Sequence, residues 1–232
     1  MKQRSVENNT NTMAYKFKIL IPARGGSKRI PKKNIIDING QPLISYSIRQ
    51  ALLLTDDVYV STDNDEIAQI SKKYGAKVIN RPKSISGDHS KSEEVVFHFL
   101  DTVKDVDTFV LLQATTPLVR YDQIFDGIKL MDECDSVISV CEERSYYWKK
   151  VGIADNYDGT PVNFTPGNRH RTQDMLPWYK ENGAFYITNK ENFITSGLLY
   201  SGKVGFIQMD KTQSVDLDTK TDLILLKKLL TE

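Results

Sequence analysis

Short apolar runs alternate with amphipathic stretches from residue 17 to about residue 142, and this alternation constrains the fold more than any other feature of the sequence. The first run, FKILIPA, is nearly continuous in apolar and β-branched side chains, which is typical of a strand buried on both faces. Similar runs follow at residues 57–63, 77–82, 108–118 and 135–143. The segments between these runs have either the apolar spacing of a helix or matched helix start and stop signals. The pattern predicts an α/β fold with a largely parallel sheet, in which ligands bind at the carboxyl ends of the strands.

This regular pattern stops between residues 143 and 182, a segment rich in Tyr, Trp, Pro, Gly, Asn and Arg that has no sustained helical or strand period. We interpret residues 143–182 as an insertion into a core formed by residues 14–142 and 183–232. Strands are expected again in ENGAFYITN and KVGFIQM, and an amphipathic helix with inward-facing leucines is expected in KTDLILLKKLL. Residues 1–13 are interpreted as a polar tail.

Composition excludes several classes of function. The 31 Lys and Arg against 30 Asp and Glu leave a net charge of +1, so no global field attracts nucleic acid or an anionic membrane. No apolar run approaches the ~18 residues that a membrane helix needs, and the first residues lack the apolar segment of a signal peptide. Cys134 and Cys141 have no zinc-like or CxxC spacing. We therefore expect a cytoplasmic protein without nucleic-acid or membrane partners.

The most informative segment is IPARGGSKRIPKKN, residues 21–34. It has five positive side chains and no acidic one between Arg24 and Lys33. Gly25 and Gly26 allow a tight turn that brings backbone N–H groups close to a ligand, and Ser27 can donate a hydrogen bond. This chemistry suits a polyphosphate, although neither GxxxxGK[ST] nor GxGxxG is present. On composition alone, a solvated basic loop is an equally good interpretation.

The order of residues in this segment, A-R-x-G-S-K-x-x-x-x-K-N from Ala23 to Asn34, closely resembles the signature of the acylneuraminate cytidylyltransferases, or CMP-sialic acid synthetases. The bacterial legionaminic and pseudaminic acid cytidylyltransferases look much the same. Weaker matches follow in the family's order: RPKSISGD, LLQATTPL, RTQDMLP before ENGAFYI, and VDLDT. The resemblance implies a three-layer fold like that of the nucleotide-diphospho-sugar transferases. It also implies a reaction in which CTP and a nine-carbon 2-keto sugar acid give a CMP-sugar and pyrophosphate.

The resemblance assigns the nucleotide site residue by residue. Arg24 and Lys33 are the expected catalytic cations, because positive charge must stabilise the negative charge that builds on the α-phosphate and the departing pyrophosphate. Asp88 and Ser92 match positions around the base and ribose, but they could equally cap the following helix. The full set that the resemblance assigns to CTP is Arg24, Gly26, Ser27, Lys28, Lys33, Asn34, Arg81, Asp88 and Ser92.

Asp216 and Asp218 stand two residues apart in SVDLD, so an extended segment points both carboxylates to one face. Hard oxygen donors on one face suit Mg²⁺, and the family resemblance provides most of the support for a metal there. Asp218 could instead cap the helix that follows it. As a further catalytic role, Asp218 could help to deprotonate the sugar hydroxyl, either directly or through a metal-bound water.

A sugar acid needs a cation and an apolar wall. The resemblance assigns Gln113 to the sugar, although an ordinary strand end explains it too; the other candidates are Arg171, Gln173, Phe185 and Tyr186. In relatives the insertion forms the dimer and reaches into the partner's site, so we expect a homodimer in which Tyr146, Tyr147 and Trp148 pack at the interface.

The identity of the sugar stays open, because Ala114 and Thr116 replace the Pro and Ser that are common in relatives. Two other activities remain as alternatives: a 3-deoxy-manno-octulosonate cytidylyltransferase and a catalytically silent sugar-nucleotide binding protein. An RNA-binding role is disfavoured by the near-zero charge and by the lack of aromatic side chains within the basic loop.

Overall fold

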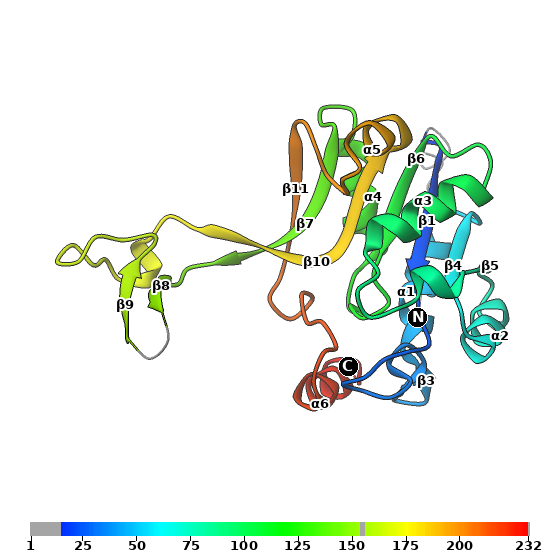
Figure 1. Ribbon diagram of the computed structural model, residues 1–232, viewed down its shortest axis with the longest axis horizontal. Coiled ribbons are helices and arrows are strands. Elements are labelled where there is room, and N and C mark those ends of the chain that lie inside the picture. The colour runs from blue at the N-terminus through cyan, green and yellow to red at the C-terminus, as the bar shows by residue number, and fades with distance from the viewer. Residues whose placement is uncertain (1–14, 154–155, 232) are drawn as a thin grey trace, which may run out of the picture.

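The computed structural model describes residues 15–153 and 156–231, so the polar tail expected at residues 1–13 lies outside the described residues. A seven-stranded sheet forms the centre of the molecule, in the order β11-β7-β10-β6-β1-β4-β5 (Figure 1). The strands are β1 (Phe17–Pro22), β4 (Val58–Thr62), β5 (Lys77–Asn80), β6 (Thr108–Leu112), β7 (Ser136–Glu143), β10 (Trp178–Asn189) and β11 (Val204–Met209). Only β10 runs antiparallel to its neighbours, β6 and β7. The prediction of a largely parallel sheet is confirmed.

Helices cover both faces of this sheet, because the central strands are apolar on both sides. In β1, Ile19 packs in a cluster with Ile48 of α1 (Leu43–Leu52) and Ile124 of α4 (Tyr121–Leu130). The next residue, Leu20, points to the opposite face, in a cluster with Phe99 of α3 (Ser92–Thr102). The α2 helix (Asp65–Lys73) belongs with α1 and α4, and α5 (Lys190–Ser196) with α3. The result is the three-layer arrangement that the family resemblance implies.

The described residues of the segment 143–182, which we call the arm, extend away from this body (Figure 1). The arm contains a hairpin of β8 (Trp148–Ile153) and β9 (Asn156–Pro161) and the first part of β10. Its strand period is weak in the sequence because little of it faces a core: Leu176 is 86% exposed and Trp178 is 45% exposed. A bulge between Glu181 and Tyr186 separates the arm from the part of β10 that belongs to the central sheet.

Two details differ from the expectations. The α5 helix was not predicted, because its seven residues span only about two helical turns, too few to establish a helical period. The last helix, α6 (Lys220–Leu229), was expected to pack its leucines inward. Only part of this is right: Leu226 is fully buried, but Ile224 is 59% exposed and Leu225 is 41% exposed. The reason is that α6 packs on a small separate cluster rather than on the broad face of the sheet.

That separate cluster joins segments from opposite ends of the chain. Ile30 of the basic loop packs with Leu217, which lies between the two aspartates, and with Leu226 of α6; Ile38 and Leu43 complete the buried set. The backbone N–H of Leu217 also donates to the carbonyl of Thr115, at 2.9 Å. Apolar packing therefore holds the basic loop beside the Asp216–Asp218 segment. The lysines and arginines of the loop repel one another, so their charges alone would not hold them together.

We expect Ile30→Ala to destabilise the protein by about 2–4 kcal/mol, because Ile30 is only 5% exposed and its removal leaves a cavity under the basic loop. Chemical denaturation of wild type and variant gives this difference in the free energy of unfolding. Ile224→Ala removes the same side chain from the exposed face of α6 and serves as the matched control. Equal effects of the two substitutions would show that the cluster does not anchor the loop.

Candidate functional site

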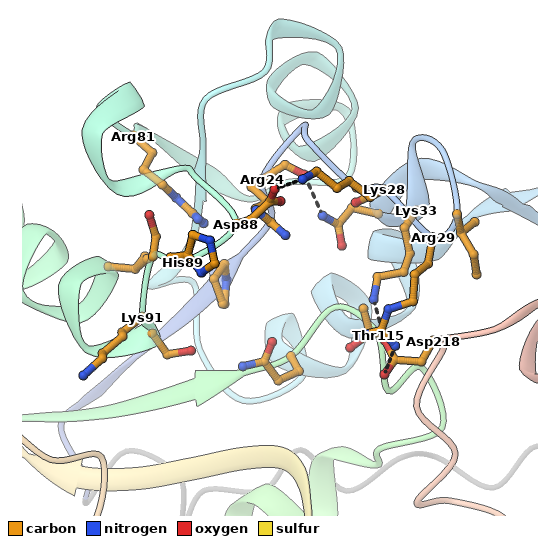
Figure 2. Close-up of a pocket in the computed structure, with 18 residues that line it drawn as sticks. Arg24, Lys28, Arg29, Lys33, Arg81, Asp88, His89, Lys91, Thr115 and Asp218 are labelled. Atoms are coloured by element: carbon orange, nitrogen blue, oxygen red, sulfur yellow. Dashed lines mark hydrogen bonds and ion pairs between the residues drawn. The ribbon is translucent and has the colours of Figure 1, made fainter. Parts of the chain in front are cut away.

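A cavity of about 520 Å³ opens at the carboxyl ends of the parallel strands (Figure 2). Its walls come from the basic loop after β1, the segment between β5 and α3, the end of β6 and the segment before α6. This is the edge of the sheet at which α/β folds bind ligands. The cavity brings together most of the residues singled out in the sequence: Arg24, Ser27, Lys28, Lys33, Asn34, Arg81, Asp88, Ser92, Gln113 and Asp218.

At one end of the cavity, two cations of the basic loop converge on Asp88. The Arg24 Nη1 atom lies 3.0 Å from a carboxylate oxygen of Asp88, and the Lys28 ammonium contacts the other oxygen. The hydrogen bond from Lys28, together with that from Arg24, holds the pKa of Asp88 below its usual value. Asp88 does not cap α3, and Ser92 is already inside that helix, whose N-cap is Lys91. The capping interpretation of Asp88 and Ser92 is therefore wrong.

At the other end, two more cations converge on Asp218, as Figure 2 shows. Lys33 Nζ lies 3.1 Å from Asp218 Oδ1, and Arg29 Nη1 lies 3.0 Å from Oδ2. Partial burial acts to raise the pKa of Asp218, but Lys33 and Arg29 outweigh burial and keep that pKa below its usual value. Thr219 caps α6 by accepting from the N–H of Asp222, so the capping interpretation of Asp218 is also wrong.

The Asp216 side chain is exposed to solvent, whereas Asp218 is half-buried, and Asp216 forms no salt bridge within the described residues. Protein atoms nevertheless surround the Asp216 carboxylate closely enough to desolvate it. Burial raises the pKa of Asp216, the neighbouring Asp218 adds to this, and a hydrogen bond with Thr115 opposes it. Both aspartates line a second cavity of about 490 Å³, whereas only Asp218 also lines the first. Asp218 thus lies where the two cavities meet.

These two carboxylates fit a magnesium ion that is shared with a substrate. Within residues 15–153 and 156–231, no cluster of three or more His, Cys, Asp or Glu side chains could hold a metal by itself. Mg²⁺ does not require such a cage, since it is usually bound through one or two carboxylates, with substrate phosphates and water as its remaining ligands. Asp216 and Asp218 are therefore the residues that could hold it.

The conformation of the basic loop is fixed from inside the protein. Asn34 is only 6% exposed, and its amide donates to the carbonyl of Arg24 at 2.9 Å. The N–H of Gly25 is directed at Asp63 rather than into the cavity, at 2.8 Å. Of the groups expected to face a ligand, Asn34 and Gly25 thus mainly shape the loop, and the cationic side chains face the cavity.

Arg81 is the most buried cation of the site, at 5% exposure. Its Nε and Nη2 atoms donate to the hydroxyl and the carbonyl of Ser61, at 3.1 and 2.5 Å. Burial lowers the pKa of Arg81 to about 10, Asp63 acts in the opposite direction, and Arg24 adds to the decrease. Arg81 is therefore positively charged at neutral pH and rigidly held, which suits selective recognition of a polar ligand.

The residues predicted for the sugar are not all brought together. Gln113 lines the cavity at the end of β6. Phe185 is fully buried in the core beneath α4, so its assignment to the sugar is wrong. The neighbouring Tyr186 stacks on Tyr200, with ring centroids 6.2 Å apart, and its hydroxyl donates to Glu181 at 2.5 Å.

Arg171 and Gln173 lie in the arm and do not line the cavity of their own chain. Arg171 is largely exposed and pairs with Asp174 at 2.8 Å. The carbonyl of Gln173 accepts from Arg144 at 3.1 Å.

Several lining residues were missed in the sequence, namely Arg29, His89, Lys91 and Thr115. Arg29 had a signal, since it is one of the five cations of the basic loop. Thr115 directly follows the strand end that carries Gln113, so the sheet-edge rule could have found it. His89 and Lys91 carry no pattern of their own and are placed by the path of the segment between β5 and α3.

A family model and two relatives that match this chain are all described as cytidylyltransferases. The model of a family described as "Cytidylyltransferase" matches residues 18–231. N-acylneuraminate cytidylyltransferase A of Danio rerio is 37% identical over 229 residues, which cover 96% of this chain and 53% of that protein. Pseudaminic acid cytidylyltransferase of Campylobacter jejuni is 32% identical over 212 residues, which cover 88% of this chain and 91% of that protein. The chain thus spans about half the length of some relatives and nearly all of others.

Solved structures share the fold. The structure of CMP:2-keto-3-deoxy-manno-octonic acid synthetase complexed with CTP matches with a TM-score of 0.70 and 19% identity, over 94% of this chain and 99% of that one. The 4-diphosphocytidyl-2C-methyl-D-erythritol synthase of Anaerococcus prevotii matches with a TM-score of 0.61 and 14% identity, over 93% of this chain and 99% of that one. These matches confirm the predicted architecture.

Proposed function

Because this chain belongs to the cytidylyltransferase family, we propose that it transfers the CMP group of CTP to a nonulosonic, sialic-acid-like sugar acid and releases pyrophosphate. The observation that carries the proposal is the cavity in which a cationic loop faces a carboxylate on the same open space. Lys33 and Asp218 are 185 residues apart in the sequence and 3.1 Å apart in the fold. A polyphosphate needs the cation, and a hydroxyl nucleophile needs the carboxylate or a metal that it holds.

In the proposed reaction, the anomeric hydroxyl oxygen of the sugar acid attacks the α-phosphorus of CTP. A new P–O bond forms, the bond from the α-phosphorus to the bridging oxygen of pyrophosphate breaks, and the hydroxyl proton passes to a base. Arg24, Lys28 and Lys33 bind the phosphates and offset the charge that grows on the leaving pyrophosphate. Asp218 faces the same cavity and is the group to which we assign the proton.

We also propose that Asp216 and Asp218 hold Mg²⁺ together with the phosphates of CTP. When bound, the ion neutralises phosphate charge and helps to orient the reacting groups. The loop cations that contact Asp218 exchange this partner for phosphate oxygens when the nucleotide binds. Lys33 therefore contacts Asp218 in the free protein and the phosphates of CTP during turnover.

Pyrophosphate release measured with each of the four ribonucleoside triphosphates tests the proposed activity. The acceptor panel contains N-acetylneuraminic, legionaminic and pseudaminic acids and 3-deoxy-manno-octulosonate. Release with CTP and a nonulosonic acid is the expected result. Release only with the eight-carbon acid would favour the alternative 3-deoxy-manno-octulosonate cytidylyltransferase activity. CTP binding without pyrophosphate release would favour the other alternative, a catalytically silent sugar-nucleotide binding protein.

The arm supports a second proposal, that the protein is a homodimer. Several large apolar side chains of the arm are exposed in the described chain, including Trp148, Leu176 and Trp178. Arg171 and Gln173 do not line the nucleotide cavity of their own chain, and in a dimer they are available to the acceptor site of the partner. We therefore propose that residues 143–182 are a dimerisation element and that the rest of the described chain is the catalytic core.

We expect Leu176→Asp to weaken the dimer by more than about tenfold, because a carboxylate would replace an apolar arm side chain that is 86% exposed in the single chain. Light scattering at a series of protein concentrations measures this change. Leu53→Asp is the matched control, since Leu53 is 62% exposed on the core. A wild-type protein that is monomeric throughout the series would contradict the proposal.

We propose that the enzyme acts in the cytoplasm. Both cysteines, Cys134 and Cys141, lie in the described part of the chain and are free thiols, which suits a reducing compartment. A separate finding is that no helix in the described ranges has the length and apolar character needed to cross a membrane.

A further inference from the structure

Asp63 is an acidic residue beside a site built from cations, and the reaction described above gives it no role. It directly follows β4, the strand that lies between β1 and β5 in the sheet. The basic loop begins at the end of β1, and Arg81 follows the end of β5. Asp63 therefore occupies the middle one of three neighbouring strand ends that together form the nucleotide side of the cavity.

Its clearest contact is with the backbone of the basic loop. The N–H of Gly25 donates to Asp63 Oδ1 at 2.8 Å, and the contact is partly buried. The next residue, Asn64, packs so closely that a Cβ atom on Gly25 would lie 2.9 Å from the Asn64 Cβ. Lys32, farther along the loop, pairs with Glu66 at 2.6 Å. The residues after β4 thus contact the loop near both of its ends, through a partly buried hydrogen bond to Gly25 and an exposed ion pair with Lys32.

Asp63 also acts on the other side, toward Arg81. The positive charge of Arg24 disfavours the charged form of Arg81, and the nearby Asp63 favours it. The guanidinium is further held by the two hydrogen bonds to Ser61, two residues before Asp63. The end of β4 and the residue that follows it therefore support both the basic loop and the most buried cation of the site.

We propose that Asp63 is a positioning residue of the nucleotide site, which sets the conformation of the basic loop by accepting the N–H of Gly25. The inference rests on the proposed function, because it concerns the loop that would bind the triphosphate of CTP. Asp63 touches no substrate in this scheme. It acts through Gly25 and, by its charge, through the arginines on both sides.

The proposal and simple electrostatics predict opposite changes in ligand affinity when Asp63 is removed. A carboxylate near a polyanion site repels the polyanion, so its removal strengthens binding if Asp63 is only a bystander. If Asp63 positions the loop, removal of the hydrogen-bond acceptor weakens binding despite the loss of repulsion. A net hydrogen bond of ordinary strength corresponds to a change of about tenfold in affinity.

Three substitutions separate these cases. Asp63→Ala removes both the acceptor and the charge, Asp63→Asn keeps an acceptor oxygen without the charge, and Asp63→Glu keeps the charge but displaces the acceptor by one methylene. Asp65→Ala removes an exposed carboxylate two residues away and serves as the control. Calorimetry with inorganic tripolyphosphate and with CTP measures affinity, and thermal unfolding checks that each variant is folded.

We expect Asp63→Ala and Asp63→Glu to weaken the binding of both ligands by about tenfold, with Asp63→Asn and Asp65→Ala binding at least as tightly as wild type. In turnover, the KM for CTP rises in the Ala and Glu variants, and the KM for the sugar acid does not. If Asp63→Ala does not fold, the ligand affinities of Asp63→Glu and Asp63→Asn are enough to test the positioning role.

Two results would overturn the inference in distinguishable ways. Wild-type protein that binds both ligands, with Ala and Glu variants that bind as well as wild type or better, contradicts the positioning role alone. Wild-type protein that binds neither CTP nor tripolyphosphate contradicts the proposed function, and the inference fails with it.

Discussion

Replacement of Lys33 by alanine is expected to lower kcat by about 10²–10³-fold in the CTP-dependent reaction. The physical reason is the position of its side chain, which is only 21% exposed and lines the cavity. A cation in such a place is poorly screened by water, so its attraction to a developing phosphate charge is strong. The loss should appear in kcat as well as in the KM for CTP, because the charge on the leaving pyrophosphate grows in the transition state.

Lys32→Ala is the matched control for this experiment. It removes the same charge from the adjacent position, where the side chain is 69% exposed and pairs with Glu66 away from the cavity. Such an exposed ion pair contributes little to stability, so this variant should keep nearly full activity. Continuous pyrophosphate assays at saturating acceptor give both parameters. Equal activities of the two variants would show that Lys33 does not stabilise the leaving group.

The fold was predictable because its central strands are buried on both faces. A run such as FKILIPA, followed by a loop and a helical pattern, leaves few arrangements other than a parallel sheet between helical layers. The arm was harder to predict, because a hairpin with exposed side chains has no apolar face to give it a period. The seven residues of α5 are too short for a helical period to emerge from local composition.

The site was predictable where one segment carries the chemistry and less so where distant segments meet. The basic loop is contiguous, so its glycines, serine and cations could be identified together. The contact of Lys33 with Asp218 depends on the packing of Ile30 against Leu217, two apolar residues that attract no attention in a search for chemistry. Asp63 shows the same difficulty, since its partner is a backbone N–H that no sequence pattern reveals.

The error at Phe185 had a simple geometric cause. Successive residues of a strand point to opposite faces of the sheet, so Phe185 and Tyr186 cannot both contact one ligand from the same side. In the structure Phe185 enters the core and Tyr186 packs with α3 and Tyr200 on the other face. The alternation rule, applied to neighbouring candidates, would have forced a choice between them.

Asp218→Asn is expected to lower kcat by at least about 10²-fold, since the amide can neither take the proton of the acceptor hydroxyl nor neutralise a metal ion. Binding of CTP in the absence of Mg²⁺ is expected to move the other way. The two oxygens of Asp218 hold Lys33 and Arg29 in the free protein, and loss of the negative charge leaves both cations available to the triphosphate. The variant should therefore bind metal-free CTP at least as tightly as wild type.

This divergence distinguishes a functional role of Asp218 from a structural one. A side chain needed only for folding would lower turnover and nucleotide affinity together, and its loss would lower the melting temperature. Asp210→Asn removes an exposed carboxylate from the same segment and provides the control for the change in net charge. Calorimetry with CTP in EDTA and turnover measured over a Mg²⁺ series test both halves of the prediction. Weaker metal-free binding in Asp218→Asn would mean that the aspartate shapes the loop rather than competing with phosphate for its cations.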